Sequence, residues 1–153
     1  MKKFFKYNWQ VRDEWFKWCH QLTHEELLKI RQGGMGSILH TLFHIVEVEY
    51  SWMRGILGEE DHPFYFEDYA TLQKIEILSS QLRTEIAPFL KLPLEGSNHE
   101  FVRVAWDETP YTVEDILHHL IAHEIHHIGQ LSVWAREIGL SPVPVHFIGR
   151  NLI

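Results

Sequence analysis

The sequence predicts an all-α protein that folds as an antiparallel four-helix bundle, with one long connection between its third and fourth helices. Apolar residues recur at spacings of three and four through four long segments, and no segment shows a strand pattern of comparable strength. Glycine and proline clusters separate these segments. The chain has 153 residues, of which 45% are apolar, so we expect one domain over residues 1–153.

The first predicted helix spans about residues 5–22. Its apolar residues form two stripes: Phe5, Trp9, Phe16 and Cys19 in one, and Val11, Trp15, Trp18 and Leu22 in the other. A helix that is apolar over so much of its circumference is covered on two sides. We therefore expect the core to cover one side and a second subunit to cover the other.

The second predicted helix follows a glycine cluster at residues 33–36. Ser37 is a suitable N-cap, and Gly58 is a suitable end for the helix after Leu57. The third helix is predicted over residues 68–87. Pro88 ends it, because proline cannot continue the backbone hydrogen bonds of a helix.

A linker is predicted over residues 88–110. It is marked by helix-breaking residues, namely Pro88, Pro93, Gly96 and Pro110. Residues 101–106 inside it read as a short extended piece. Thr112 then opens the last helix, with Asp115 three residues later as in a capping box, and Gly139 closes it.

Composition excludes several classes of function. The net charge of −7 argues against nucleic-acid binding, which usually requires a basic face. No stretch approaches the roughly 20 apolar residues of a membrane span, and the N-terminus lacks a signal-peptide pattern. Cys19 is the only cysteine, which fits a reducing compartment. We therefore expect a cytoplasmic protein with neither a nucleic-acid nor a membrane partner.

The last predicted helix carries a histidine pair with metal-ligand spacing. His123 and His127 are four residues apart, so both project from one face, about one turn apart. Neutral imidazoles bind zinc at about 2.0–2.1 Å. A third ligand must come from a facing helix, where His40 and His44 are available. His44 lies among apolar residues and is the better candidate.

Two other interpretations of these histidines remain open. The pair can be ordinary polar residues of the core, because this spacing also occurs by chance. Residues 123–127 also match HExxH, the zinc-protease signature, in which Glu124 would be the general base. The extended protease pattern fails, because Gln130 and Val133 occupy the positions of its glycine and third histidine.

Three motifs, in the right order, resemble one known family. They are FKYNWQ at residues 5–10, SILHTLFHIVEVEYSW at residues 37–52 and HLIAHEIHHIGQL at residues 119–131. Over nearly its whole length the chain resembles the DinB-like proteins, the DinB/YfiT superfamily. Carried over by position, the metal ligands of that family fall on His44, His123 and His127. Ile128 departs from the family pattern, which often has arginine there.

The resemblance implies an antiparallel four-helix bundle, a homodimer and a divalent metal ion, with zinc or nickel as the expected metals. Some members of the family are transferases or isomerases that use low-molecular-weight thiols, and many have no assigned activity. We therefore expect a metal-dependent enzyme similar to low-molecular-weight-thiol S-transferases, with a small-molecule substrate and with such a thiol as cofactor. Tyr7 and Trp9 are candidates to line its pocket, and Glu124 is a candidate base or hydrogen-bond partner of a ligand.

The rival hypothesis is a non-catalytic metal-binding or interaction protein. In that case the ion would mainly tie the second and fourth predicted helices together. A fourth protein ligand, such as His40 or Glu47, would then close the coordination shell. An enzyme would instead keep a coordination position open for an exchangeable ligand.

Overall fold

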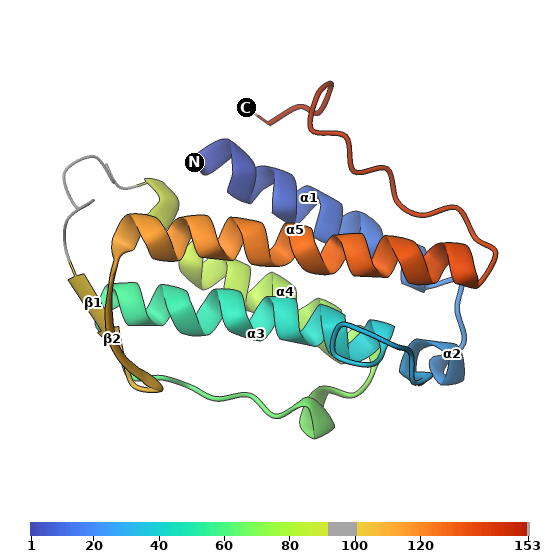
Figure 1. The fold of residues 1–153 in the computed structure, drawn as a ribbon, viewed down its shortest axis with the longest axis horizontal. Helices are drawn as coiled ribbons and strands as arrows, with labels where there is room; N and C mark the ends of the chain where they lie inside the picture. The colour runs from blue at the N-terminus through green and yellow to red at the C-terminus, as the bar shows by residue number, and fades with distance from the viewer. Residues whose placement is uncertain (92–100, 153) are drawn as a thin grey trace.

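The computed structural model describes residues 1–91 and 101–152. Four long helices dominate it (Figure 1): α1 (Lys2–Cys19), α3 (Ile38–Leu57), α4 (Leu72–Ile86) and α5 (Val113–Glu137). The smaller elements are α2 (His24–Leu28), the 3-10 turns η1 (Phe66–Tyr69) and η2 (Phe89–Lys91), and the antiparallel strands β1 (Phe101–Val104) and β2 (Asp107–Thr112). The protein is thus predominantly helical, with one small β-hairpin.

The long helices pack in a closed order, in which α3 contacts α4 and α5, and α1 contacts the same two helices from the other side. The colours of Figure 1 show α3 and α4 running in one direction and α1 and α5 in the other. Two helices that follow each other in the same direction need a return connection, and residues 58–71 provide it along the molecule (Figure 1). The longest connection still lies between α4 and α5, where the sequence predicted it, but the predicted antiparallel arrangement holds only for the pairs α3–α5 and α1–α4.

The caps of the helices agree well with the sequence. Ser37 Oγ accepts a hydrogen bond from the backbone N–H of His40, and Gly58 ends α3 with a positive φ of 69°. Thr112 caps α5 through the backbone N–H of Asp115, as predicted. Helix α4 begins after Thr71, because the preceding residues of the predicted helix belong to the 3-10 turn η1.

Helix α1 ends at Cys19, three residues before its predicted end. The extended piece predicted at residues 101–106 contains strand β1, and the sequence prediction did not include the second strand of this hairpin, β2, which extends to Thr112. Pro93 and Gly96 of the predicted linker lie outside the described residues.

The outer side of α1 is covered by the C-terminal segment of the same chain, residues 140–152. Tyr7 and Trp18 donate hydrogen bonds from their side chains to the backbone carbonyls of Val145 and Ser141, at 2.7 and 2.9 Å. Val143 of this segment is itself buried. The two apolar stripes of α1 therefore do not require a second subunit, and the expected homodimer keeps only the family resemblance as its support.

The core of the protein contains several aromatic residues of α1, among them Trp15 and Phe16, both at most 1% exposed. Cys19 is completely buried beside them, and this burial raises the pKa of its thiol. No helix in the described part of the chain is long and apolar enough to cross a membrane.

Candidate metal centre

Three imidazole rings meet between α3 and α5. The Nε2 atom of His123 lies 3.2 Å from Nε2 of His44 and 3.1 Å from Nε2 of His127. In residues 1–91 and 101–152, these three are the one group of His, Cys, Asp or Glu side chains close enough to share an ion, with ligand atoms within 4.8 Å of one another. The structure thus brings together the three histidines that the sequence singled out.

The helices determine this arrangement. Helices α3 and α5 lie side by side in opposite directions, so a position early in α3 faces the middle of α5 (Figure 1). His123 and His127 are one turn apart on α5 and present their rings to the same side. His44 reaches them from α3, with its ring centroid 4.9 Å from that of His123.

Hydrogen bonds hold two of the rings by their other nitrogen. Nδ1 of His44 donates to Glu47 Oε1 at 3.1 Å, and Nδ1 of His127 donates to Gln130 Oε1 at 2.7 Å. Because each acceptor is an oxygen, the ring proton lies on Nδ1 and Nε2 keeps a free lone pair. Metal-binding histidines are commonly oriented by such a bond to the nitrogen that does not bind the metal.

Gly34 packs against the glutamine that holds His127. The φ of this glycine is +52°, and a Cβ atom at this position would lie 2.8 Å from Gln130 Oε1. A larger residue would therefore displace Gln130. The loop before α3 thus helps to fix the orientation of a ring on α5.

The surroundings of these histidines favour the neutral form of their rings. Burial, together with the neighbouring imidazoles, lowers the pKa of His123 to about 3. Burial is also the main cause that lowers the pKa of His127. Nε2 of His123 carries at most one proton, which can point to only one of its two neighbours, so at least one of the two contacts of 3.1 and 3.2 Å brings electron-rich nitrogens together without a hydrogen bond. A cation between the three nitrogens would remove this repulsion.

The distances also fit a metal ion. Three nitrogens at about 2.0–2.1 Å from a tetrahedral ion are separated from one another by about 3.3 Å, close to the two separations seen here. Neutral imidazole is the form that coordinates metals. The donor set can therefore hold a divalent ion.

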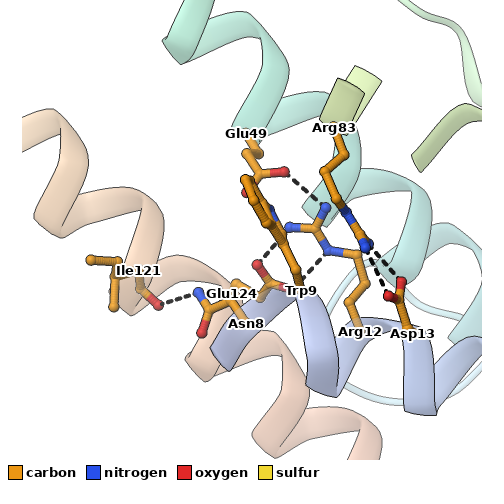
Figure 2. A network of polar contacts seen from close by, with 8 residues as sticks. All are labelled: Asn8, Trp9, Arg12, Asp13, Glu49, Arg83, Ile121 and Glu124. Carbon is orange, nitrogen blue, oxygen red and sulfur yellow. Dashed lines mark hydrogen bonds and ion pairs between the residues drawn. The ribbon is translucent and has the colours of Figure 1, made fainter. Parts of the chain in front are cut away.

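A buried ion-pair network, drawn in Figure 2, includes Glu124, the residue that follows His123 on α5. Arg12 of α1 donates from Nε and Nη2 to the two carboxylate oxygens of Glu124, at 2.8 and 2.6 Å, and from Nη1 to Glu49 Oε2 at 2.8 Å. Trp9 donates to the other oxygen of Glu49 at 2.8 Å. Arg12 thereby links α1 to α3 through Glu49 and to α5 through Glu124.

Burial shifts the proton equilibria within this network. Burial alone would lower the pKa of Arg12, but the carboxylates of Glu124 and Glu49 reverse this effect and raise it. Burial raises the pKa of Glu124, against the opposing effect of Arg12. Arg12 is completely buried, yet it stays charged, because the two carboxylates compensate for the hydration that its guanidinium loses.

Comparison with known proteins now gives the family. A family model described as the DinB family matches residues 1–151. The chain belongs to the DinB family. It is also 61% identical over 153 residues to a protein of Bacillus subtilis (strain 168) named YizA and described as uncharacterized, covering 99% of this chain and 96% of that protein.

In this DinB protein, Glu124 has a different partner from the one that the protease hypothesis requires. Its side chain is only 3% exposed and pairs with the guanidinium of Arg12. Both carboxylate oxygens accept hydrogen bonds from Arg12, so this carboxylate forms a bidentate ion pair with α1. The glutamate of the HExxH pattern therefore forms a buried ion pair with Arg12 in this protein.

The other candidates lie at different places. Tyr7 lines a separate cavity of about 190 Å³ between α1, α5 and the C-terminal segment. Trp9 points to Glu49. His40 stacks on Phe66, with ring centroids 4.2 Å apart. None of these side chains joins the three-histidine group among the described residues.

The sequence reasoning missed Arg12 altogether. A single arginine in an amphipathic pattern is usually a surface residue, and its two partners are 37 and 112 residues away in the chain. The available signal was its position within a helix that is otherwise apolar on two sides. A charge in such a helix has to find a buried partner of opposite charge.

Proposed function

We propose that this DinB protein binds one divalent metal ion through His44, His123 and His127 and acts as a metal-dependent enzyme similar to low-molecular-weight-thiol S-transferases. The observation that carries this proposal is the convergence of three Nε2 atoms within 4.8 Å. The Nδ1 bonds from His44 to Glu47 and from His127 to Gln130 support it, because they leave the converging lone pairs free.

A catalytic role is favoured by the number of ligands. A structural zinc site is usually closed by four protein ligands, whereas a catalytic site keeps a position for an exchangeable ligand. The two residues that could close this site are engaged elsewhere. The ring of His40 stacks on Phe66, and Glu47 lies at Nδ1 of His44, away from the converging nitrogens. These contacts argue against the non-catalytic alternative.

A divalent ion held there would lower the pKa of a bound thiol or water and so supply a nucleophile near neutral pH. The chain provides the orientation. Glu47 and Gln130 hold two of the rings, and Arg12 holds Glu124 on the ligand-bearing turn of α5. The substrate of the proposed enzyme is a small electrophile, zinc or nickel is the proposed metal, and the cofactor is a low-molecular-weight thiol.

Further parts of the proposal rest on the family alone. They are a four-helix bundle as the description of the helix packing, a homodimer as the assembly, and the cytoplasm as the location. The antiparallel pairing of α3 and α5 supports the first of these.

The first experiment measures metal content by mass spectrometry. We expect about one ion per native chain and none in the His44→Ala, His123→Ala and His127→Ala variants, because a site of two histidines binds weakly. The matched control is His118→Ala, an exposed histidine of the same helix, which should keep the ion. A native protein that takes up neither zinc nor nickel would overturn the proposal.

Activity is then tested by conjugation of added thiols to small electrophiles. Turnover should depend on the metal and disappear in the His123→Ala variant. Full turnover in that variant would refute the catalytic part of the proposal and leave metal binding untouched. Metal binding without any turnover over a broad panel of thiols and electrophiles would favour the non-catalytic alternative.

The residues that orient the rings give a second prediction. Glu47→Ala and Gln130→Ala should each weaken metal binding by about 10–100-fold, because a ring that lacks its Nδ1 acceptor is no longer held in place. Competition with a chromophoric chelator measures the dissociation constant. Gln130→Glu keeps an oxygen acceptor and should remain close to the native value. Equal loss in Gln130→Glu and Gln130→Ala would contradict this explanation.

A further inference from the structure

A second cavity lies next to the histidine group, where the β-hairpin meets α3 and α5. Its volume is about 280 Å³, and its lining residues are Trp52, Tyr111, Asp115, Ile116 and His119. His119 is one turn from His123 on α5, and their ring centroids are 5.6 Å apart. The cavity is therefore adjacent to one of the proposed ligands and distinct from all three.

Aromatic rings form most of the walls. The centroid of Trp52 lies 5.7 Å from the ring of His119 and 5.7 Å from that of Tyr111, both in edge-to-face geometry. Trp106, in the turn of the hairpin, packs edge-on against Trp52 at 5.3 Å. Such walls favour a planar aromatic group, because aromatic pairs gain energy from offset-stacked and edge-to-face contacts beyond simple burial.

The polar groups of two lining residues are already paired within the protein. The hydroxyl of Tyr111 donates to Asp107 Oδ2 at 2.6 Å. Asp115 Oδ2 accepts a hydrogen bond from Thr112 Oγ1 at 2.6 Å. With the hydroxyl of Tyr111 paired, the walls formed by Trp52, Tyr111 and Ile116 offer a ligand mainly apolar surface, which disfavours a strongly hydrated group.

The hairpin that closes the cavity is seated directly on α3. Gly55 lies one turn after Trp52, and a Cβ atom there would lie 2.6 Å from Cγ1 of Val104. The backbone of α3 and strand β1 thus approach so closely that only glycine fits. This contact fixes the hairpin beside Trp52 and makes the cavity a preformed feature.

We propose that this cavity binds the aromatic group of the substrate and directs its reactive atom along α5 toward His123. This inference rests on the proposed function and narrows its substrate class to aromatic electrophiles. A cavity of this volume is at the lower end of small-molecule sites, so it holds a group of one or two rings.

The test compares two probes of similar shape, nitrobenzene and its saturated counterpart nitrocyclohexane, by ligand-observed saturation-transfer NMR on the full chain. We expect nitrobenzene to bind about tenfold more tightly, since only its ring gains aromatic contacts with Trp52 and Tyr111. Trp52→Leu and Tyr111→Leu should each remove most of this difference. Equal affinity of the native protein for both probes would overturn the proposal.

Two controls keep the result interpretable. Phe101→Leu changes a 70%-exposed aromatic residue of the same hairpin that does not line the cavity, and it should leave nitrobenzene binding unchanged. Circular dichroism checks that each variant is folded, and Tyr111→Leu serves as the decisive variant if Trp52→Leu unfolds. Native nitrobenzene affinity in a folded Tyr111→Leu chain would also overturn the proposal.

The same measurement on His44→Ala separates the two proposals. His44 does not line the cavity, so this variant should lose the metal and keep its nitrobenzene affinity. Failure of the metal proposal would therefore appear as absent metal with intact aromatic binding. Failure of the cavity proposal would appear as bound metal without preference for the aromatic probe.

Discussion

Replacing Arg12 by methionine is expected to lower the free energy of unfolding by about 3–5 kcal/mol, because it leaves two buried carboxylates without their cation. The side chains of Glu49 and Glu124 are only 8% and 3% exposed, so water cannot replace the lost partner. Urea denaturation followed by circular dichroism measures the change. The metal affinity should fall as well, since Glu124 lies between two ligand candidates on α5.

A matched control is available on α4. Arg83 forms a bidentate ion pair with Asp13, whose side chain is 56% exposed, so Arg83→Met should cost only about 0–1 kcal/mol. The triple variant Arg12→Met, Glu49→Gln and Glu124→Gln removes the uncompensated charges and should recover much of the lost stability. If Arg12→Met costs no more than Arg83→Met, the network contributes little to folding.

Zinc should raise the unfolding temperature of the metal-free protein by about 10 °C. Free zinc at about a thousandfold excess over its dissociation constant stabilises the folded state by about 4 kcal/mol, and a domain of this size gains about 2–4 °C per kcal/mol. Scanning calorimetry with and without zinc measures the shift.

The controls for this shift use histidines of α3 and α5. His44→Ala removes the α3 member of the three-histidine group and should abolish the shift, whereas the exposed His118→Ala should keep it. An equal shift in His44→Ala would mean that zinc acts at another place on the protein.

The grouping of the three histidines could be predicted because its determinants are local. The spacing of His123 and His127 sets their common face, and the apolar neighbours of His44 set its direction. Helix α3 was predicted to within a residue for the same reason, since Ser37 and Gly58 are caps that act within one turn.

The rest depended on contacts between distant parts of the chain. The common direction of α3 and α4 follows from the path of residues 58–71, on which helical periodicity gives no information. Arg12 looked like a surface residue because its partners lie on other helices. The aromatic cavity was also missed, since it forms only where Tyr111 of the hairpin meets Trp52 of α3.

The burial of Cys19 has a practical consequence for the chemistry proposed here. The chain has one thiol, it is closed off from solvent, and its raised pKa keeps it protonated at neutral pH. It cannot act as the sulfur nucleophile, and alkylating reagents will not reach it in the folded protein. Any sulfur transferred in an assay must therefore come from the thiol that the experimenter adds, and a cysteine introduced at the surface becomes a unique point for attaching a spectroscopic probe.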